Sequence, residues 1–188
     1  ARFYTEVSMP APTKTLTVLI GLPFSGKTSI ARSLAGADVD VIERDAILDA
    51  INAEVATREQ LQEQARLIQS PVSTLYQTHA ENAWNDAVTH EYVRRVLERV
   101  TQSSAAHVIV DGTHLQPLSR SFIAACREWH RRAIVVHTPV DACIDRFRGA
   151  VRTGLRKRLT EEDIQNLASV FVPPASEEGF DEILERRS

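Results

Sequence analysis

An eight-residue stretch near the N-terminus constrains this chain more than any other feature. Residues 21–28 read Gly-Leu-Pro-Phe-Ser-Gly-Lys-Thr, in which two glycines frame four residues and are followed by lysine and threonine. The glycines let the backbone turn tightly, so that successive N–H groups can face a phosphate chain. The lysine can then bind the β- and γ-phosphates, and the threonine hydroxyl can hold Mg²⁺. The stretch therefore predicts a nucleotide-phosphate site.

The segments on either side favour a real phosphate-binding loop (P-loop) over a chance match. Residues 16–20 form an apolar run of the length expected for a buried parallel strand. Residues 29–35 carry apolar side chains at helical spacing, and Gly36 is placed to end that helix. This order puts the positive end of a helix dipole at the phosphates. The residues expected to contact nucleotide are Gly21, Ser25, Gly26, Lys27, Thr28 and Ser29.

Composition and charge exclude several other classes of protein. Hydrophobic residues make up 43% of the 188 residues and charged residues 25%, as in ordinary globular domains. A formal charge of −3 argues against a protein that coats nucleic acid by bulk attraction. No apolar run or signal peptide indicates a membrane partner, and Cys126 and Cys143 are expected to be buried free thiols. Together these features predict a cytoplasmic protein.

The order of apolar and helical segments predicts one domain. Pro10 and Pro12 make residues 1–14 a flexible lead-in, and Met9 would be a natural start, so residues 1–8 are expected to be extraneous. Residues 15–188 then form a single P-loop domain, a three-layer α/β sandwich with a parallel sheet and helices on both faces. Besides residues 16–20, strands are expected at residues 39–42, 105–114 and 133–138, with a short one in the tail at 177–184. Helices are expected over residues 46–69, 73–101, 117–129, from 140 onward, and 160–170.

Two of the expected strands are followed by acidic side chains. Asp45 comes shortly after residues 39–42, and Asp111 lies near the end of residues 105–114. Ligands of open parallel sheets bind outside the carboxyl ends of the strands, so both carboxylates should lie beside the P-loop. Asp45 could instead cap the next helix, and Asp111 could form a turn. We favour functional roles for both, with Asp111 at the Mg²⁺ site.

A run of basic residues follows the fourth expected strand. Arg146, Arg148 and Arg152 begin a stretch that continues to Arg158 without an acidic residue. We interpret residues 146–158 as an arginine-rich lid that closes over the transferring phosphoryl group. A solvated loop or a helix end is the alternative. Arg120 is a further binding candidate, because a cation in the first turn of a helix opposes its dipole.

In combination, these motifs resemble a known family. The chain is similar to P-loop kinases of the polynucleotide 5′-hydroxyl kinase and zeta-toxin-like group over nearly its whole length from about residue 15. The similarity lies in GLPFSGKT, ERD after the second strand, DGTH after the third, the basic lid, RLTEEDI and FVPPASEEGFDEIL, in that order. The P-loop alone is generic, whereas the Arg-Asp pair and the Pro-Pro…Glu-Gly-Phe tail are more discriminating.

The resemblance implies an ATP- and Mg²⁺-dependent kinase. Lys27 and Thr28 would hold the phosphates and the metal, and Asp45 would be the general base for the acceptor hydroxyl. Asp111 would shape the metal and acceptor site, although the position of both acids on one rim leaves the base assignment open. Of the lid arginines, Arg152 is the candidate for stabilising the transition state and Arg146 for contacting nucleotide. The expected acceptor contacts are Asp45, Asp111, Thr113 and Arg120.

Three residues depart from the family pattern. Phe24 stands where these kinases usually have a small residue, and it could stack on the acceptor. Leu48 occupies a position where the phage-type polynucleotide kinase uses an arginine on its nucleic acid, and His114 replaces a frequent asparagine. The last two residues count against a polynucleotide acceptor but not against phosphoryl transfer.

These observations leave three hypotheses for the function. Motif order and the tail favour a kinase acting on a polynucleotide 5′-hydroxyl, which is our first prediction. The mild acidity and the missing arginine favour a kinase acting on a small-molecule hydroxyl, such as a sugar or an antibiotic. The third hypothesis is a nucleotide-dependent switch, in which Asp45 and the lid arginines would have no catalytic task.

Overall fold

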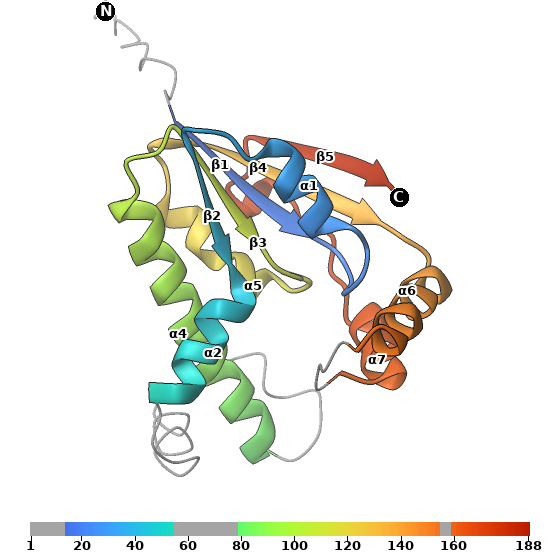
Figure 1. Cartoon of the computed structure of the whole chain (residues 1–188). Helices are drawn as coiled ribbons and strands as arrows, with labels where there is room; N and C mark the ends of the chain where they lie inside the picture. Colours follow the sequence, from blue (N-terminus) through green and yellow to red (C-terminus); the bar gives the residue numbers. More distant parts are fainter. Residues whose placement is uncertain (1–13, 55–78, 155–158) are drawn as a thin grey trace, which may run out of the picture.

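The computed structural model describes residues 14–54, 79–154 and 159–188 (Figure 1). Its strands form one five-stranded sheet in the order β2-β3-β1-β4-β5, and every neighbouring pair is parallel. The strands are β1 (Lys14–Ile20), β2 (Val39–Glu43), β3 (His107–Asp111), β4 (Trp129–His137) and β5 (Glu182–Arg187). The predicted α/β fold with a parallel sheet is therefore confirmed. The tail also contains a strand, but it is Glu182–Arg187 instead of residues 177–184.

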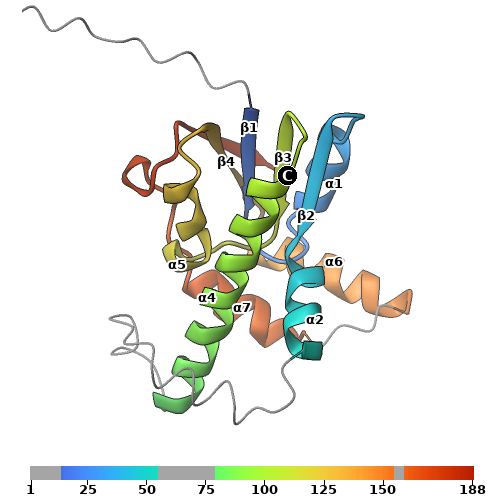
Figure 2. The ribbon, with the colours of Figure 1, turned by 90° about the vertical axis from the view of Figure 1, so that its left-hand side faces the viewer.

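Helices cover both faces of this sheet. Figure 2 shows α1 on one face and α4 and α5 on the other, which is the consequence of right-handed crossovers between parallel strands. The α-helices are α1 (Lys27–Leu34), α2 (Arg44–Glu54), α4 (His79–Gln102), α5 (Pro117–Arg120), α6 (Val140–Arg152) and α7 (Glu161–Ser169). Two 3₁₀ helices are η2 (Ser121–Ala125) and η3 (Ser176–Glu178). No helix in the described ranges is long and apolar enough to cross a membrane.

An apolar core lies on each face of the sheet. Leu16, Val18 and Ile20 of β1 share one buried cluster with residues of α4, whereas Leu19 belongs to the cluster on the α1 side. Successive residues of a strand point to opposite faces, so a strand covered on both sides reads as an unbroken apolar run. This burial is the physical reason that β1 could be recognised from sequence.

The expected helix over residues 117–129 was wrong in its second half. Helical structure ends at Ala125, and Trp129 is already the first residue of β4. Trp129 pairs with Lys14 of β1, and the Lys14 ammonium lies 4.9 Å from the centre of the indole ring. The start of β4 was missed because its residues are polar. Two of them, Arg131 and Arg132, form ion pairs with acids at β5 that the sequence places 50 residues away.

The structure tests the expected boundaries of the helices in the second half of the chain. The helix expected over residues 160–170 is α7, and Thr160 caps it. The Thr160 hydroxyl accepts from the Asp163 N–H at 3.1 Å, and the Asp163 carboxylate accepts from the Thr160 N–H at 2.7 Å. Of the stretch interpreted as a lid, residues 146–152 belong to α6, and Gly149 lies inside that helix. Residues 155–158, and the expected boundaries near residues 69 and 73, lie outside the described residues.

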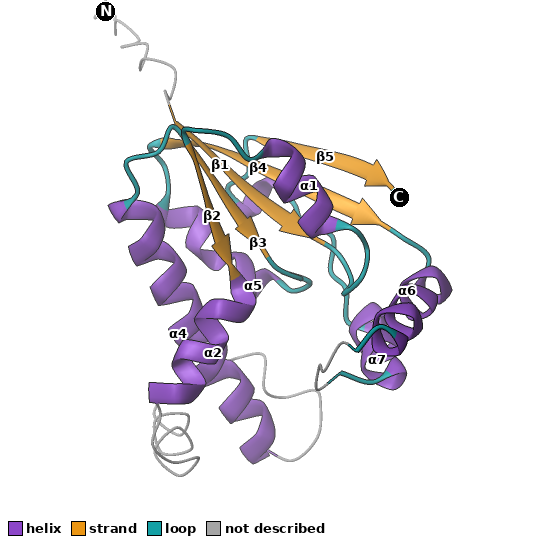
Figure 3. Ribbon diagram, viewed as in Figure 1, coloured by secondary structure: helices purple, strands orange, loops and turns teal. Residues whose placement is uncertain are grey.

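The fold brings the carboxyl ends of the strands to one edge. Figure 3 shows β1, β3 and β4 running toward this edge, with α2 and α4 on one side of it and α6 and α7 on the other. β2 and β3 end level with each other, because Glu43 pairs with Asp111. The loop between β1 and α1 therefore lies between the two helix pairs.

Candidate active site

The backbone of the P-loop is held in a conformation that only glycine tolerates at two points. Gly21 and Gly26 have φ angles of 154° and 100°. A Cβ on Gly21 would lie 2.8 Å from the Val136 carbonyl oxygen, so the loop packs directly on β4. The Gly21 N–H also donates to the carbonyl of Thr113 at 3.0 Å, which ties the P-loop to the loop after β3. Thr113 thus lies in the site, through its backbone.

Lys27 places a buried ammonium group across this loop. The residue is 7% exposed, and Nζ donates to the Leu22 carbonyl at 2.6 Å and to Ser25 Oγ at 3.3 Å. A buried charge requires such partners, and a phosphate oxygen is a stronger acceptor than either of them. The site is therefore arranged to attract a phosphate chain.

Thr28 and Asp111 meet at the start of α1. The Thr28 hydroxyl donates to Asp111 Oδ2 at 2.9 Å, although 83 residues separate the two in sequence. A hydroxyl beside a carboxylate is the hard oxygen donor set that suits Mg²⁺. The described residues contain no cluster of three His, Cys, Asp or Glu that could hold a metal. A Mg²⁺ ion here would take its other ligands from water and phosphate, as this ion usually does.

Asp45 lies on the same edge of the sheet, in the first turn of α2. Its carboxyl side chain is 66% exposed, in contrast to the half-buried Asp111. Both carboxylates lie near the phenol of Tyr92, whose pKa is raised first by burial and then by Asp111 and Asp45. Thr28 and Asp111 are thus in contact, and Asp45 lies near Tyr92, just after the end of the neighbouring strand β2.

A buried histidine and tyrosine lie beneath these groups. His114 is fully buried, and its ring bonds the Leu19 carbonyl through Nδ1 at 2.8 Å and the Tyr92 hydroxyl through Nε2 at 2.6 Å. Burial lowers the pKa of His114 to about 3, so the imidazole is neutral at pH 7. Since a carbonyl can only accept, Nδ1 carries the proton and Nε2 accepts from Tyr92. Sequence reasoning missed this pair, because Tyr92 matches the helical apolar pattern of α4 and gives no polar signal.

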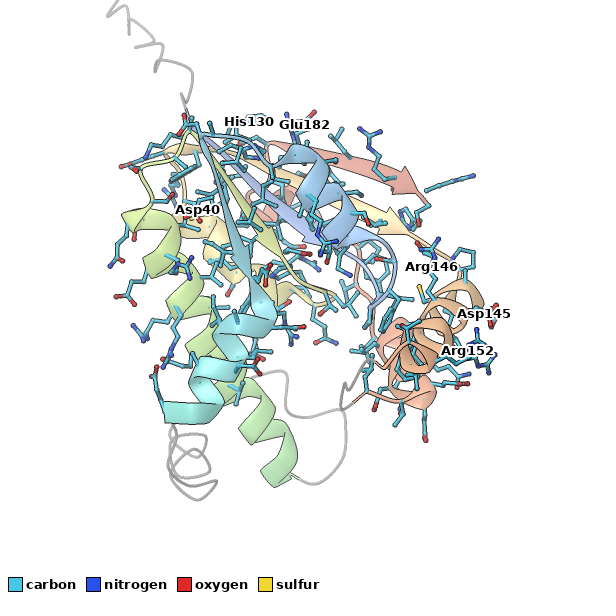
Figure 4. All side chains as sticks on the ribbon, viewed as in Figure 1. Asp40, His130, Asp145, Arg146, Arg152 and Glu182 are labelled. Atoms are coloured by element: carbon cyan, nitrogen blue, oxygen red, sulfur yellow. The ribbon has the colours of Figure 1, made fainter. Side chains whose placement is uncertain are left out.

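The basic residues of α6 differ in what they contact. Arg146 Nη1 donates to the Phe24 carbonyl and to Ser188 Oγ, both at 3.1 Å. Arg146 lies in the middle of α6 and is labelled in Figure 4. Arg148 forms two bonds to Glu161, at 2.8 and 2.7 Å, and so joins α6 to α7. Arg152 is exposed in the last turn of α6. Of the two arginines assigned to the site, the structure therefore places Arg146 at the P-loop.

The expected binding role of Arg120 does not fit its surroundings. Its side chain is fully buried, and the guanidinium bonds both carboxylate oxygens of Glu178 at 2.8 and 2.6 Å. It also donates to the carbonyls of His114 and Val172 at 2.8 and 3.1 Å. Arg120 therefore holds the tail against the loop after β3 and offers no surface to a substrate. Its partner Glu178 is 58 residues away, which is why the sequence gave no sign of it.

The Phe24 ring does not lie where it was expected, and Leu48, which replaces an arginine of the phage-type enzyme, packs against the core. The Phe24 ring packs edge-on against Phe147 of α6, with ring centres 5.5 Å apart, instead of facing an acceptor. Its φ of 61° is rare for a non-glycine residue and fits a position where a small residue is usual. Leu48 packs partly buried against the core on the α4 side of the sheet.

An apolar cavity of about 600 Å³ opens next to the P-loop. It extends from the loop to the β4–α6 connection, the end of α7 and the end of β5. Its lining includes Leu22, Leu115, Pro139, Phe171 and Ser188.

A protein-family model described as an AAA domain matches residues 16–174, and the chain belongs to this family. The match covers the P-loop, both acidic strand ends, α6 and α7. No curated protein matches the chain by sequence.

Solved structures of similar fold include two kinases. A gluconokinase from Sinorhizobium meliloti 1021 matches with a TM-score of 0.56 and 16% identity, covering 94% of this chain and 84% of that one. A shikimate kinase from Acinetobacter baumannii, solved with shikimate, matches with a TM-score of 0.51 and 17% identity, covering 94% of this chain and 86% of that one. At such identities the likeness concerns the fold.

Proposed function

We propose that this AAA domain protein is a kinase that transfers the γ-phosphate of ATP to a hydroxyl group of a small molecule. The observation that carries the proposal is the hydrogen bond between Thr28 and Asp111 beside the buried Lys27, with the exposed Asp45 on the same rim. A nucleotide-dependent switch would need Lys27, Thr28 and Asp111 but would have no use for Asp45.

The residues divide into a nucleotide side and an acceptor side. Lys27 and the P-loop N–H groups would hold the phosphates, and Thr28 with Asp111 would hold Mg²⁺, which neutralises phosphate charge when bound. Because Asp111 is engaged with Thr28, Asp45 is the better candidate for orienting the acceptor hydroxyl and taking its proton late. Arg146 would contact the nucleotide, and Arg152 remains our candidate from the lid for the transition state.

A small-molecule acceptor has more support than the polynucleotide that the motif order favoured. The two similar kinases act, by their names, on gluconate and shikimate. The chain has a net charge of −3, whereas nucleic-acid ends are bound through basic surfaces. Leu48, which replaces an arginine of the phage-type enzyme, packs against the core. We therefore place the polynucleotide second.

Transfer of labelled γ-phosphate from ATP–Mg²⁺ tests this proposal. The acceptor panel would hold sugars, sugar acids, aminoglycosides, nucleosides and 5′-hydroxyl oligonucleotides. Asp45→Asn should abolish transfer while ATP binding is retained, because the carboxylate acts on the acceptor and not on the nucleotide. Asp49→Asn is the matched control, since Asp49 is an exposed acid one turn further along α2.

Each outcome of the panel bears on a different hypothesis. Label on a small molecule that depends on Asp45 supports the proposal. Label on oligonucleotides alone would restore the polynucleotide prediction. Tight ATP binding without transfer to any acceptor would favour the switch.

A further inference from the structure

We propose that Arg44 binds an anionic group of the acceptor, so that the substrate is a small hydroxyl compound carrying a carboxylate or a phosphate. This inference rests on the proposed kinase function and narrows its substrate class. Arg44 is the first residue of α2 and directly precedes Asp45, the candidate base.

The structure holds the stem of Arg44 in place. Gly112, just after β3, leaves the room that the stem occupies: a Cβ on Gly112 would come within 2.9 Å of both Cβ and Cδ of Arg44. The same Cβ would lie 2.7 Å from His114 Cε1, so any side chain at residue 112 would displace the arginine, the His114 ring or both. This packing restricts the stem of Arg44, whereas a long side chain in solvent samples many rotamers.

The guanidinium of Arg44 lies against an aromatic ring. Its guanidinium carbon lies 5.8 Å from the centre of the Tyr92 ring, within the range of a cation–π contact. Tyr92 is itself fixed by its bond to His114, and His114 by its bond to Leu19. This chain of contacts connects Arg44 to the strand that leads into the P-loop, so the guanidinium is pre-organised relative to the phosphate site.

The charges around Arg44 leave it able to bind a ligand. In the described part of the chain its carboxylate partner is Asp45, with Nη1 and Oδ1 4.0 Å apart, which is beyond hydrogen-bond distance. The Arg44 side chain is 34% exposed. The other charged groups near Tyr92 and His114 are Asp111, Lys27 and Arg120. Asp111 bonds Thr28 and Lys27 bonds the P-loop, whereas Arg120 is paired with Glu178.

The chemistry of the site favours an anion as the partner of Arg44. A guanidinium presents a planar fork of donors that matches a carboxylate or a phosphate group. Without this cation, Asp45 and Asp111 would repel an anionic acceptor from the rim. Because Arg44 and Asp45 are adjacent, the anionic group must lie close to the phosphorylated hydroxyl, as in a sugar acid or a sugar phosphate.

Steady-state transfer assays on matched acceptors test the role of Arg44. The panel would pair each sugar acid and sugar phosphate with its neutral parent sugar or polyol. Arg44→Gln should raise KM for the preferred anionic acceptor roughly 10- to 100-fold, the range expected for a lost hydrogen bond to a charged group. Its KM for ATP and its activity on the neutral parent should stay unchanged. Arg127→Gln is the control, since Arg127 is exposed and precedes β4 at the opposite edge of the sheet.

A binding measurement separates this inference from the kinase proposal. Calorimetric titration of the enzyme–ADP complex with gluconate and with glucose 6-phosphate needs no transfer, and the two ligands distinguish carboxylate from phosphate recognition. Heat with wild type that is lost in Arg44→Gln supports the assignment even if no acceptor is labelled. Equal binding by both proteins, or no binding of either anion by wild type, would overturn it.

One further result would assign Arg44 a different task. Arg44→Gln could lower transfer equally for anionic and neutral acceptors and shift the pH profile of kcat. Arg44 would then serve the Asp45 carboxylate instead of the acceptor, and the inference would be wrong.

Discussion

The charged side chains at this edge of the sheet differ in how firmly other residues hold them. Lys27 and Asp111 bond other residues of the loop region, whereas Asp45 and Arg44 point to a partly exposed rim. This difference fits the proposed roles, because a nucleotide-binding loop must be rigid and an acceptor site must be accessible. His114 bonds Tyr92, which lies against Arg44, and the carbonyl of Leu19, in the strand that leads into the P-loop. The protonation of His114 can be tested by measurement.

His114 should make the protein sensitive to acid. Its pKa is about 6.5 in the unfolded chain and about 3 in the fold. Between these values the unfolded state binds a proton that the folded state does not, so stability falls as pH falls through this window. His114→Asn should flatten the fall between pH 6.5 and 4 by up to about 1.4 kcal/mol per pH unit. Asparagine tolerates the left-handed backbone found here, where φ is 44°.

Urea unfolding at several pH values measures this difference. His90→Asn is the control, because His90 is exposed on α4. A slope in His114→Asn equal to that of wild type would show that His114 is not the buried neutral group described here.

At the scale of elements, two contacts between distant segments hold the site together. Arg120 joins the loop after β3 to the tail around η3, and Phe147 joins α6 to the P-loop. Neither contact can be read from local sequence patterns. Each contact can be tested by one substitution that removes it and one control substitution at an exposed position.

Removing Glu178 should destabilise the fold strongly. Arg120 is fully buried, so Glu178→Ala leaves a guanidinium without its carboxylate partner, at a cost of about 3–5 kcal/mol. Glu177→Ala, at the exposed neighbouring position, should change the free energy of unfolding by less than about 0.5 kcal/mol. Urea denaturation of both variants checks the difference. Equal stabilities would contradict the structural role given to Arg120.

Shortening Phe147 should loosen the P-loop as well as the core. Phe147 is 9% exposed and packs on Phe24, whose carbonyl accepts from Arg146. Phe147→Ala should cost about 3–5 kcal/mol in the free energy of unfolding, as for other large core truncations. It should also weaken ATP binding, because Phe24 and Arg146 lose their support. Val151→Ala, on an exposed position of the same helix, is the control for both measurements. Unchanged ATP affinity in Phe147→Ala would show that the packing of Phe147 on Phe24 does not support ATP binding.

At the scale of the whole molecule, the parallel sheet decides where the chemistry lies. The order β2-β3-β1-β4-β5 places the P-loop strand in the centre, with acidic strand ends on one side and α6 on the other. The same arrangement serves many activities, so the fold by itself assigns no substrate. The acceptor must be argued from the rim, where Arg44 and Asp45 lie side by side.

Local chemistry was enough to predict part of this protein from its sequence. The glycine spacing of the P-loop, the apolar run of β1 and the capping box at Thr160 depend on neighbours only a few residues away. Asp45 and Asp111 could be placed on one rim because parallel strands always end at the same edge. These features follow from backbone sterics and periodicity, which a sequence carries directly.

The tertiary structure decided what depends on partners distant in the chain. The sequence suggested that Arg120 binds a ligand, but in the fold it is paired with Glu178. It also suggested that Phe24 contacts the acceptor, but the Phe24 ring packs on Phe147. The polar start of β4 was hidden for the same reason, since acids at β5 pair with its arginines. A buried charge needs a hydrogen-bonding partner, and an aromatic ring needs a packing partner. When these partners are distant in sequence, only the tertiary structure identifies them.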